Sequence, residues 1–517
     1  MGNLHLQLHD TLSGNPVPFA PRHDGEARVY CCGPTTYDIA HVGHARAALA
    51  PDILVRHLRA QGLRVTYARN ITDVDDKILK RASERGEEPM ALSARMATLY
   101  QDDMHALGCA EPDVEPKVSE HIAEIVALIE KLIAKDAAYA VTMPSGARDV
   151  YYAVRAFEGY GKLSKRNIDD LRVGARIEAS DDKRDPLDFA LWKGCVGEAW
   201  GWDSPWGKGR PGWHIECSAM SARYLGHGFD VHCGGMDLIF PHHENEIAQS
   251  EAAHPGEGNF ASVWIHNGFV NVDKEKMAKS LGNFVTIRDV YERNDAEALR
   301  YFLLGVHYRG PIGFDTEKLE SGRVVFPGVV EAERRVDHLY MAIGRLALLV
   351  AQAGSITSPA RHPKELLAFV KLASEARARA TAALDDDLNT PVVLALLTEL
   401  AKAANELCDL ALRRKKDAEL GRAAPFVAAQ LHGAIRAAAE QIGLLQADPE
   451  AYQARTQAQR LRILGASAAE IEARLRARDE ARQAKDFARA DALRKELSDL
   501  CIEVADSPEG STWRVGI

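Results

Sequence analysis

The sequence has few of the features that mark secreted or membrane proteins. It contains only 8 cysteines in 517 residues, too few for a scaffold held by disulfides. It has no run of eighteen apolar residues, so we predict no membrane span. The first residues lack the basic and apolar regions of a signal peptide. We therefore expect a cytoplasmic protein whose thiols are free or bound to metal.

Basic residues are also fewer than acidic ones, with 64 Lys and Arg against 74 Asp and Glu. The formal net charge is −10, which argues mildly against a nucleic-acid partner. A local basic face can still bind nucleic acid within an acidic chain. The length is enough for two to four domains, and a hydrophobic content of 46% allows a large buried core.

Residues 27–70 are expected to form a strand–helix–strand unit. Residues 27–32 are rich in strand-forming side chains, and Gly33-Pro34 ends that strand. A helix is predicted over about 42–61 and a second strand over 63–68. Further strands are expected at 229–232 and 262–266. Strands joined by helices at this spacing predict an α/β fold with a parallel, doubly wound sheet.

The rest of the chain changes character twice. Residues 137–212 include a predicted hairpin around 144–146 and are rich in loops, so we interpret them as an insertion into the sheet domain. Helices are expected near 92–107 and 119–135, and another from Pro241. Beyond about residue 323 glycine becomes sparse and Ala, Leu, Arg and Glu dominate, which predicts an α-helical region.

A possible set of metal ligands is spread over three segments. His242 and Glu246 are four residues apart in a predicted helix, so they share one face. Cys32 ends the first strand and Cys217 lies in a separate segment, and these segments can converge at the carboxyl edge of a parallel sheet. No CxxC pair is present. Spacing alone also fits small core cysteines and a surface helix.

Two short motifs suit phosphate chemistry. His41–His44 (HVGH) opens the helix after the first strand, where backbone N–H groups and the helix dipole favour phosphate. Gly43 allows close approach of a nucleotide. Far downstream, Lys276–Asn283 (KMAKSLGN) brings two lysines that can neutralise pyrophosphate. Taken singly, each motif also fits a chance match or a solvated basic loop.

Together the two motifs resemble class I aminoacyl-tRNA synthetases, and the remaining stretches resemble the cysteinyl-tRNA synthetase family. The resemblance runs from about residue 27 to the C-terminus. The matching stretches are Cys32–Asp38 (CGPTTYD), Asn70–Lys77 (NITDVDDK), Asp185–Phe189 (DPLDF), Arg210–Cys217 (RPGWHIEC), Phe240–Glu246 (FPHHENE), Asp385–Pro391 (DDDLNTP) and Gly510–Arg514 (GSTWR).

The resemblance implies a domain plan and a set of site residues. The plan is a Rossmann-type catalytic domain (1–136 and 213–322) split by an insertion (137–212), then a helical bundle (323–448) and a small anticodon-binding module (449–517). The implied residues are Cys32, Cys217, His242 and Glu246 for one zinc ion; Thr72, Trp213 and Asp237 for the substrate pocket; His41, Gly43, His44, Lys276, Lys279 and Ser280 for ATP, with His41, His44, Lys276 and Lys279 as the catalytic groups. Ala278 departs from the family's usual Lys-Met-Ser-Lys-Ser, and we expect this change to matter little.

The implied activity is cysteine activation by ATP, with Mg²⁺, followed by transfer to tRNA(Cys). Zinc binds thiolate well and a serine hydroxyl poorly, so it would select L-cysteine without an editing domain. The family also implies a monomer. The nearest alternative is a cysteine ligase of mycothiol synthesis, which resembles the catalytic half but lacks a full C-terminal module. A non-catalytic relative should have lost ligands or lysines, and the principal ones are all present.

Candidate RNA contacts near the C-terminus remain open. Arg474, Arg476 and Arg478 alternate along a predicted helix and so do not form one stripe; a solvated helix explains them nearly as well as RNA contact. Trp513 and Arg514 fit stacking on an unpaired base, and Trp513 fits a small core equally well. His214, His232 and His243 are candidates for orienting the metal ligands.

Overall fold

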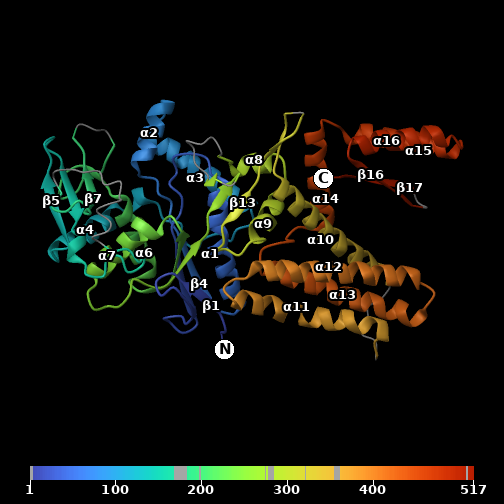
Figure 1. Ribbon diagram of the computed structural model, residues 1–517, viewed down its shortest axis with the longest axis horizontal. Coiled ribbons are helices and arrows are strands. Elements are labelled where there is room, and N and C mark those ends of the chain that lie inside the picture. Colours follow the sequence, from blue (N-terminus) through green and yellow to red (C-terminus); the bar gives the residue numbers. More distant parts are fainter. Residues whose placement is uncertain are drawn as a thin grey trace. The chain divides into compact units, whose positions relative to one another are not determined.

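The computed structural model describes residues 4–167, 183–196, 200–273, 275–276, 284–320, 322–353, 361–507 and 510–516. The chain divides into two compact units (Figure 1). The first comprises residues 1–271, 306–312 and 381–390, and the second comprises 272–305, 313–380 and 391–517. Among the described residues, no helix is both long and apolar enough to cross a membrane.

A four-stranded parallel sheet forms the centre of the first unit. Its order is β10-β9-β3-β4, with β3 at Glu26–Cys31, β4 at Arg64–Arg69, β9 at Phe229–Gly235 and β10 at Ala261–Asn267. Every neighbouring pair runs parallel. Helix α1 (Val42–Ala60) connects β3 to β4. The predicted α/β fold with a parallel sheet is therefore confirmed, and the four expected strands all belong to this one sheet.

Helices pack around this sheet and connect its strands. They are α2 (Asp76–Arg85), α3 (Pro89–Ala106), α4 (Ile122–Ala134), α6 (Trp213–Leu225) and α7 (Glu244–Ala253). Helix α6 was not predicted, although it carries Cys217. Its first turn has apolar and polar side chains mixed, and almost its whole middle is buried, so it lacks the amphipathic period that marks a surface helix.

The helix expected to open at Pro241 begins later, at Glu244. Residues Ile239–His243 form a π-type turn in which Phe240 is extended (φ −139°, ψ 131°). A residue before proline is pushed out of the α region by the proline ring. His242 therefore lies just ahead of α7 rather than inside it.

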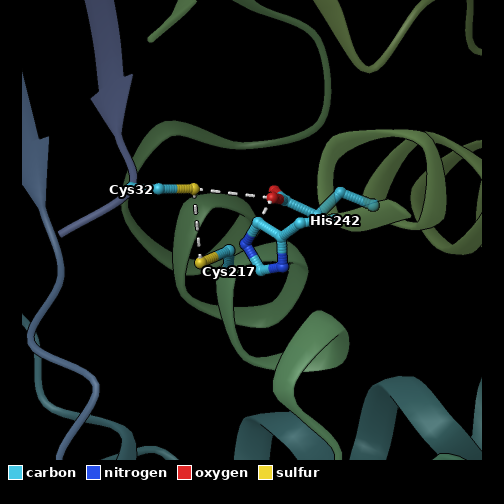
Figure 2. Close-up of side chains that lie close together, drawn as sticks. Cys32, Cys217 and His242 are labelled. Carbon is cyan, nitrogen blue, oxygen red and sulfur yellow. Dashed lines mark hydrogen bonds and ion pairs between the residues drawn. The ribbon is translucent and has the colours of Figure 1, made fainter. Parts of the chain in front are cut away.

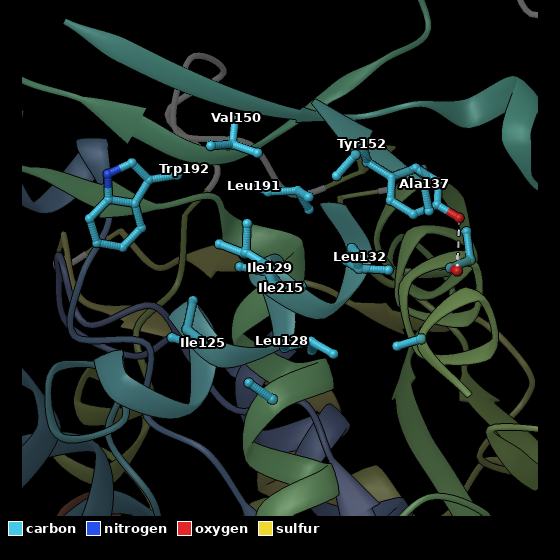
Figure 3. Close-up of a cluster of buried hydrophobic side chains, with 14 of the residues drawn as sticks. Ile125, Leu128, Ile129, Leu132, Ala137, Val150, Tyr152, Leu191, Trp192 and Ile215 are labelled. Carbon is cyan, nitrogen blue, oxygen red and sulfur yellow. Dashed lines mark hydrogen bonds between the residues drawn. The ribbon is translucent and has the colours of Figure 1, made fainter. Parts of the chain in front are cut away.

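The segment between α4 and α6 contains an antiparallel sheet of order β5-β6-β7-β8. Its strands are β5 (Ala138–Thr142), β6 (Arg148–Tyr152), β7 (Phe189–Gly194) and β8 (Gly209–Pro211). The predicted hairpin is thus confirmed as β5–β6. Trp192 from β7 and Ile129 from α4 are fully buried in a core that also includes Ile215 of α6 (Figure 3).

Three small sheets lie outside the two four-stranded sheets and before the C-terminal hairpin. They are the hairpin β1 (Gln7–Asp10) with β2 (Asn15–Pro18), the three-stranded order β12 (Glu275–Lys276), β11 (Val270–Val272) and β13 (Ile312–Phe314), and the hairpin β14 (Glu317–Lys318) with β15 (Val324–Val325).

The second unit is dominated by helices, and those from residue 327 onward lie in the region beyond about residue 323 that composition predicted to be helical. They are α8 (Ile287–Tyr291), α9 (Ala296–Leu304), α10 (Pro327–Ala351), α11 (Leu367–Asp385), α12 (Thr390–Arg413), α13 (Ala418–Glu440), α14 (Pro449–Leu464), α15 (Ala468–Gln483) and α16 (Phe487–Asp499). On α10 the buried residues Val336, Leu339, Ile343 and Leu346 recur every three or four positions, so one stripe of the helix faces the core.

The C-terminal part has a small core of its own. Helices α15 and α16 precede the antiparallel hairpin β16 (Ile502–Ser507) and β17 (Gly510–Val515). Trp513 packs, half-buried, against a cluster that includes Ile471 and Leu497. Arg478 is buried and bonds both carboxylate oxygens of Asp506 at 2.8 and 2.9 Å. Of the three alternating arginines, Arg478 therefore ties α15 to the hairpin.

Candidate metal centre and adenylate site

Four side chains from three parts of the first unit converge above the carboxyl end of the sheet. Cys32 follows β3, Cys217 lies in α6, and His242 lies just before α7 (Figure 2). Glu246 lies in the first turn of α7. One donor atom from each lies within 4.8 Å of the others. Cys217, His242 and Glu246 are almost completely buried.

The spacing of these donors fits a tetrahedral zinc ion. The two sulfurs are 3.7 Å apart, and Cys32 Sγ lies 3.5 Å from Glu246 Oε1. A tetrahedron with Zn–S bonds of about 2.3 Å places its sulfurs about 3.8 Å apart. His242 Nε2 is 3.0 Å from the same Glu246 oxygen. Two sulfurs, an imidazole and a carboxylate are also the donor types that zinc prefers.

The four groups also contact one another, and these contacts and their burial shift their pKa values. A hydrogen bond from Cys32, reinforced by His242, lowers the pKa of Cys217 to about 6 against the effect of burial. Burial, together with the neighbouring Cys217, raises the pKa of Cys32 well above its usual value. Burial opposes charge on His242, but Glu246 and Cys217 raise its pKa to about 10. Burial also opposes charge on Glu246, but His232 and His242 hold the pKa of its carboxyl at about 2.

Histidines surround the four donors. His232 Nε2 lies 2.9 Å from Glu246 Oε2, and His214 Nδ1 lies 3.0 Å from His242 Nδ1. His243 contacts Cys32 through Nε2 at 3.4 Å and His266 through Nδ1 at 2.8 Å. Cys32, His232, His243 and Glu246 also form a group whose donors lie within 4.8 Å, but it has one sulfur where the first group has two. Sequence reasoning missed His266; its only signal was its place at the end of a strand.

Thr72 and Asn70 lie beside the cluster at the end of β4. Asn70 is fully buried. Its Oδ1 accepts the Gly33 N–H at 2.9 Å and lies 3.7 Å from Cys217 Sγ, while its Nδ2 donates to Thr72 Oγ1 at 3.0 Å. Asn70 thus links the loop of Cys32 to the predicted substrate residue Thr72. Sequence reasoning gave Asn70 no role, because one polar residue after a strand carries no specific signal.

The other two predicted pocket residues lie at the same edge. Trp213 stacks on His242, with ring centroids 4.3 Å apart and an interplanar angle of 23°. Lys77 lies 5.8 Å from the Trp213 ring. Asp237 is exposed in the turn after β9. All three predicted pocket residues therefore lie in segments that leave the carboxyl ends of strands or begin α6.

The two histidines of the HVGH motif cap helix α1. His41 Nδ1 accepts the Gly43 N–H at 3.1 Å, and His44 Nδ1 accepts the His41 N–H at 3.1 Å. Their rings are adjacent, with centroids 3.9 Å apart. Because both Nδ1 atoms act as acceptors, the neutral rings carry their protons on Nε2. The pair can therefore donate hydrogen bonds at a helix N-terminus, where anions are favoured.

The lysine loop is described only in part. The backbone of Lys276 lies in β12. Ala278, Lys279 and Ser280 lie outside the described residues. Their predicted roles at ATP remain predictions.

Comparison with known protein families identifies the class of enzyme to which the chain belongs. Residues 18–323 match the family model for the class I (C) tRNA synthetase catalytic domain. Residues 379–446 match a DALR domain, and residues 465–514 match the cysteinyl-tRNA ligase anticodon binding domain. The fold and the first match together define a class I aminoacyl-tRNA synthetase, a ligase.

Comparison with individual proteins shows which family of class I synthetases the chain belongs to. The chain is 49% identical to the cysteine–tRNA ligase of Anaeromyxobacter sp. (strain K), over 99% of this chain and 100% of that one. It is 45% identical to the cysteine–tRNA ligase of Geobacter sulfurreducens, over 99% of each. The chain belongs to the cysteine–tRNA ligase family. The methionyl-tRNA synthetase of Mycobacterium tuberculosis, solved with methionyl-adenylate, shares the fold: TM-score 0.59, 17% identity, and 86% of this chain against 95% of that chain.

The predicted family is thus confirmed. The alternative drawn from the sequence, a cysteine ligase of mycothiol synthesis, is not favoured, because the chain carries the matched anticodon binding domain and aligns with cysteine–tRNA ligases over its whole length.

Proposed function

We propose that the protein activates L-cysteine with ATP and transfers the cysteinyl group to the 3′ end of tRNA(Cys), with one zinc ion held by Cys32, Cys217, His242 and Glu246. The observation that carries the proposal is the convergence of these four donors within 4.8 Å in a chain of this family. When bound, zinc supplies a thiophilic Lewis acid that accepts the substrate sulfur and binds a serine hydroxyl poorly.

The residues around the donors hold the amino acid in place. Thr72, Trp213 and Asp237 form the proposed pocket for cysteine. The Thr72 hydroxyl already accepts from Asn70, so its remaining lone pair suits the substrate ammonium group. Trp213, stacked on His242, covers the pocket and excludes water.

ATP is proposed to bind at the N-terminus of α1. The substrate carboxylate attacks the α-phosphorus, and pyrophosphate leaves. His41 and His44 donate their Nε2 protons to phosphate oxygens as charge develops there. Gly43 leaves room for the nucleotide, and Lys276, Lys279 and Ser280 bind the departing pyrophosphate, with Mg²⁺ as its counter-ion. No protein nucleophile is needed, since positioning and charge stabilisation suffice.

The remaining assignments follow the family. We propose that residues 1–136 and 213–322 form the catalytic domain, 137–212 its insertion, 323–448 the helical bundle and 449–517 the module that binds the anticodon. The insertion is too short to be an editing domain. We further propose that the protein acts as a cytoplasmic monomer, on the support of the family resemblance alone.

The test is attachment of labelled cysteine to a cysteine-accepting tRNA, with serine as competitor. Wild-type protein should charge cysteine and ignore serine. Cys217→Ser should lose bound zinc and cysteine-dependent ATP–pyrophosphate exchange. Cys408→Ser, a half-buried cysteine on α12, is the matched control and should retain both. Exchange without charging would rule out the tRNA assignment, and full charging by Cys217→Ser would rule out the zinc assignment.

A further inference from the structure

One exposed lysine at the edge of the proposed pocket has no role in the proposed mechanism. Lys77 lies in the first turn of α2, shortly after the predicted substrate residue Thr72. Its backbone N–H donates to the side chain of Asp75, the residue that caps this helix, at 2.7 Å. The cap fixes the first turn of α2 and so fixes the point from which the Lys77 side chain leaves the backbone.

The Lys77 ammonium group lies close to two aromatic rings from different segments. Its nitrogen is 5.8 Å from the centre of the Trp213 ring and 5.7 Å from the centre of the Tyr37 ring. Trp213 stacks on His242, one of the four proposed metal ligands. Tyr37 lies in the loop from β3 to α1, shortly before His41. The ammonium group therefore lies beside the proposed cysteine pocket and next to the loop that leads to the proposed ATP site.

Within the described parts of the chain, the Lys77 ammonium group forms no ion pair with a carboxylate. The neighbouring carboxylate of Asp76 pairs instead with two basic side chains of the insertion, with Lys193 Nζ at 2.5 Å and with Arg210 Nη2 at 3.3 Å. The faces of aromatic rings attract a cation but leave its charge in place. Lys77 thus brings a positive charge to the pocket that can bind an anion.

The proposed substrate has an anionic group that the residues assigned so far leave without a partner. The metal cluster is proposed to take the sulfur of cysteine, and Thr72 and Asp237 suit its ammonium group. The carboxylate of cysteine has to lie between this pocket and ATP, because it attacks the α-phosphorus. Carboxylate and phosphate repel each other as they approach, and a cation beside them lowers that repulsion.

We propose that the Lys77 ammonium group binds the carboxylate of the substrate cysteine and holds it toward the α-phosphate of ATP. Lys77 is then a substrate-binding residue, in direct contact with the group that reacts. The inference rests on the proposed function, since it requires the amino acid to bind at the metal cluster and ATP to bind at the N-terminus of α1.

The test compares L-cysteine with cysteamine, which has the same thiol and amino groups but no carboxylate. Calorimetry with the zinc-loaded protein measures the dissociation constant of each ligand without any catalysis. Lys77→Met keeps the aliphatic part of the side chain and removes the charge, so it should weaken the binding of cysteine about tenfold and leave that of cysteamine unchanged. Lys77→Arg keeps a cation and should retain most of the wild-type preference for cysteine over cysteamine.

Lys80→Met is the matched control, because Lys80 is another exposed lysine of α2. This variant should bind both ligands as the wild-type protein does. Equal weakening of both ligands in Lys77→Met, or no change in either, would overturn the inference and leave the proposed function standing. Failure of the wild-type protein to bind cysteine would overturn the proposed function itself.

Discussion

Asn70 is the residue whose removal should most clearly separate cysteine binding from ATP binding. In Asn70→Ala the half-buried Gly33 amide loses its acceptor and Thr72 loses its donor. A hydrogen bond contributes about 0.5–1.5 kcal/mol, and an amide left without a partner costs somewhat more, so the variant should be destabilised by about 2 kcal/mol. That is a sizeable fraction of a typical stability of about 5–15 kcal/mol.

The same change should loosen the two segments that meet at the pocket. Gly33 directly follows the ligand Cys32, and Thr72 is the proposed contact of the substrate ammonium group. If about 1.4 kcal/mol of the loss appears in substrate binding, the KM for cysteine rises about tenfold. The KM for ATP should stay within about twofold, because His41 and His44 are fixed by their own backbone hydrogen bonds.

Two assays check this together: urea unfolding of the zinc-loaded protein, and ATP–pyrophosphate exchange with each substrate varied. Asn294→Ala is the matched control, because it also removes a buried asparagine bond, from Nδ2 to Glu333 at 2.7 Å, in the second unit. It should be destabilised with an unchanged KM for cysteine. Equal changes in the KM for cysteine and for ATP in Asn70→Ala would refute the reasoning.

Three further predictions concern the loop that holds Cys32, the C-terminal hairpin and the protons of the metal site. In Gly33→Ala the new Cβ would lie 1.6 Å from the Asn70 carbonyl oxygen, so the variant should fail to bind zinc, and normal zinc content by atomic absorption would contradict this. Arg478→Ala breaks the bonds from α15 to Asp506 and should weaken tRNA charging while ATP–pyrophosphate exchange persists; an unchanged KM for tRNA would argue against it. At pH 7 zinc binding to the apo-protein should release about two protons. The raised pKa values of Cys32 and His242 keep these two groups protonated until zinc binds. The lowered pKa values of Cys217 and Glu246 leave those two groups already ionised. Zinc affinity should thus rise with pH, and calorimetry in buffers of different ionisation enthalpy that detects no proton release would contradict the assignment.

Much of the fold could be predicted because local patterns and tertiary structure agree. The strands β3, β4, β9 and β10 are short runs rich in strand-forming residues, and the structure places all four in one parallel sheet. The hairpin β5–β6 followed from turn residues between two β-rich runs. In the helical half, composition and period were enough to predict α10 to α16 as a region, although not their individual ends.

Other features depended on contacts that no local pattern records. Helix α6 is buried around most of its surface, so it has no polar face to reveal it. The start of α7 was misplaced because Phe240, before proline, leaves the helical region. Trp513 was compatible with RNA stacking and with a core, and its partly buried packing against the C-terminal cluster could not be predicted from the sequence.

The residues of the candidate site also fall into two groups, those predicted from the sequence and those that only the structure revealed. Cys32, Cys217, His242 and Glu246 came from the family resemblance, since spacing alone left a surface helix and core cysteines as an equal alternative. The structure brings the four together. Of the polar residues around them, His232 was already a candidate from the sequence, whereas His266 at the end of β10 and Asn70 after β4 were not. Only the sheet register places His266 and Asn70 near the cluster, so sequence spacing could not reveal their contacts.

The central claim is that a zinc ion in this cluster binds the sulfur of the substrate. X-ray absorption at the zinc edge of the purified protein tests it directly, because the method counts sulfur ligands. Two sulfurs, from Cys32 and Cys217, should be found in the free protein, three after addition of cysteine, and still two after addition of serine. A sulfur count that does not change on adding saturating cysteine would contradict the account.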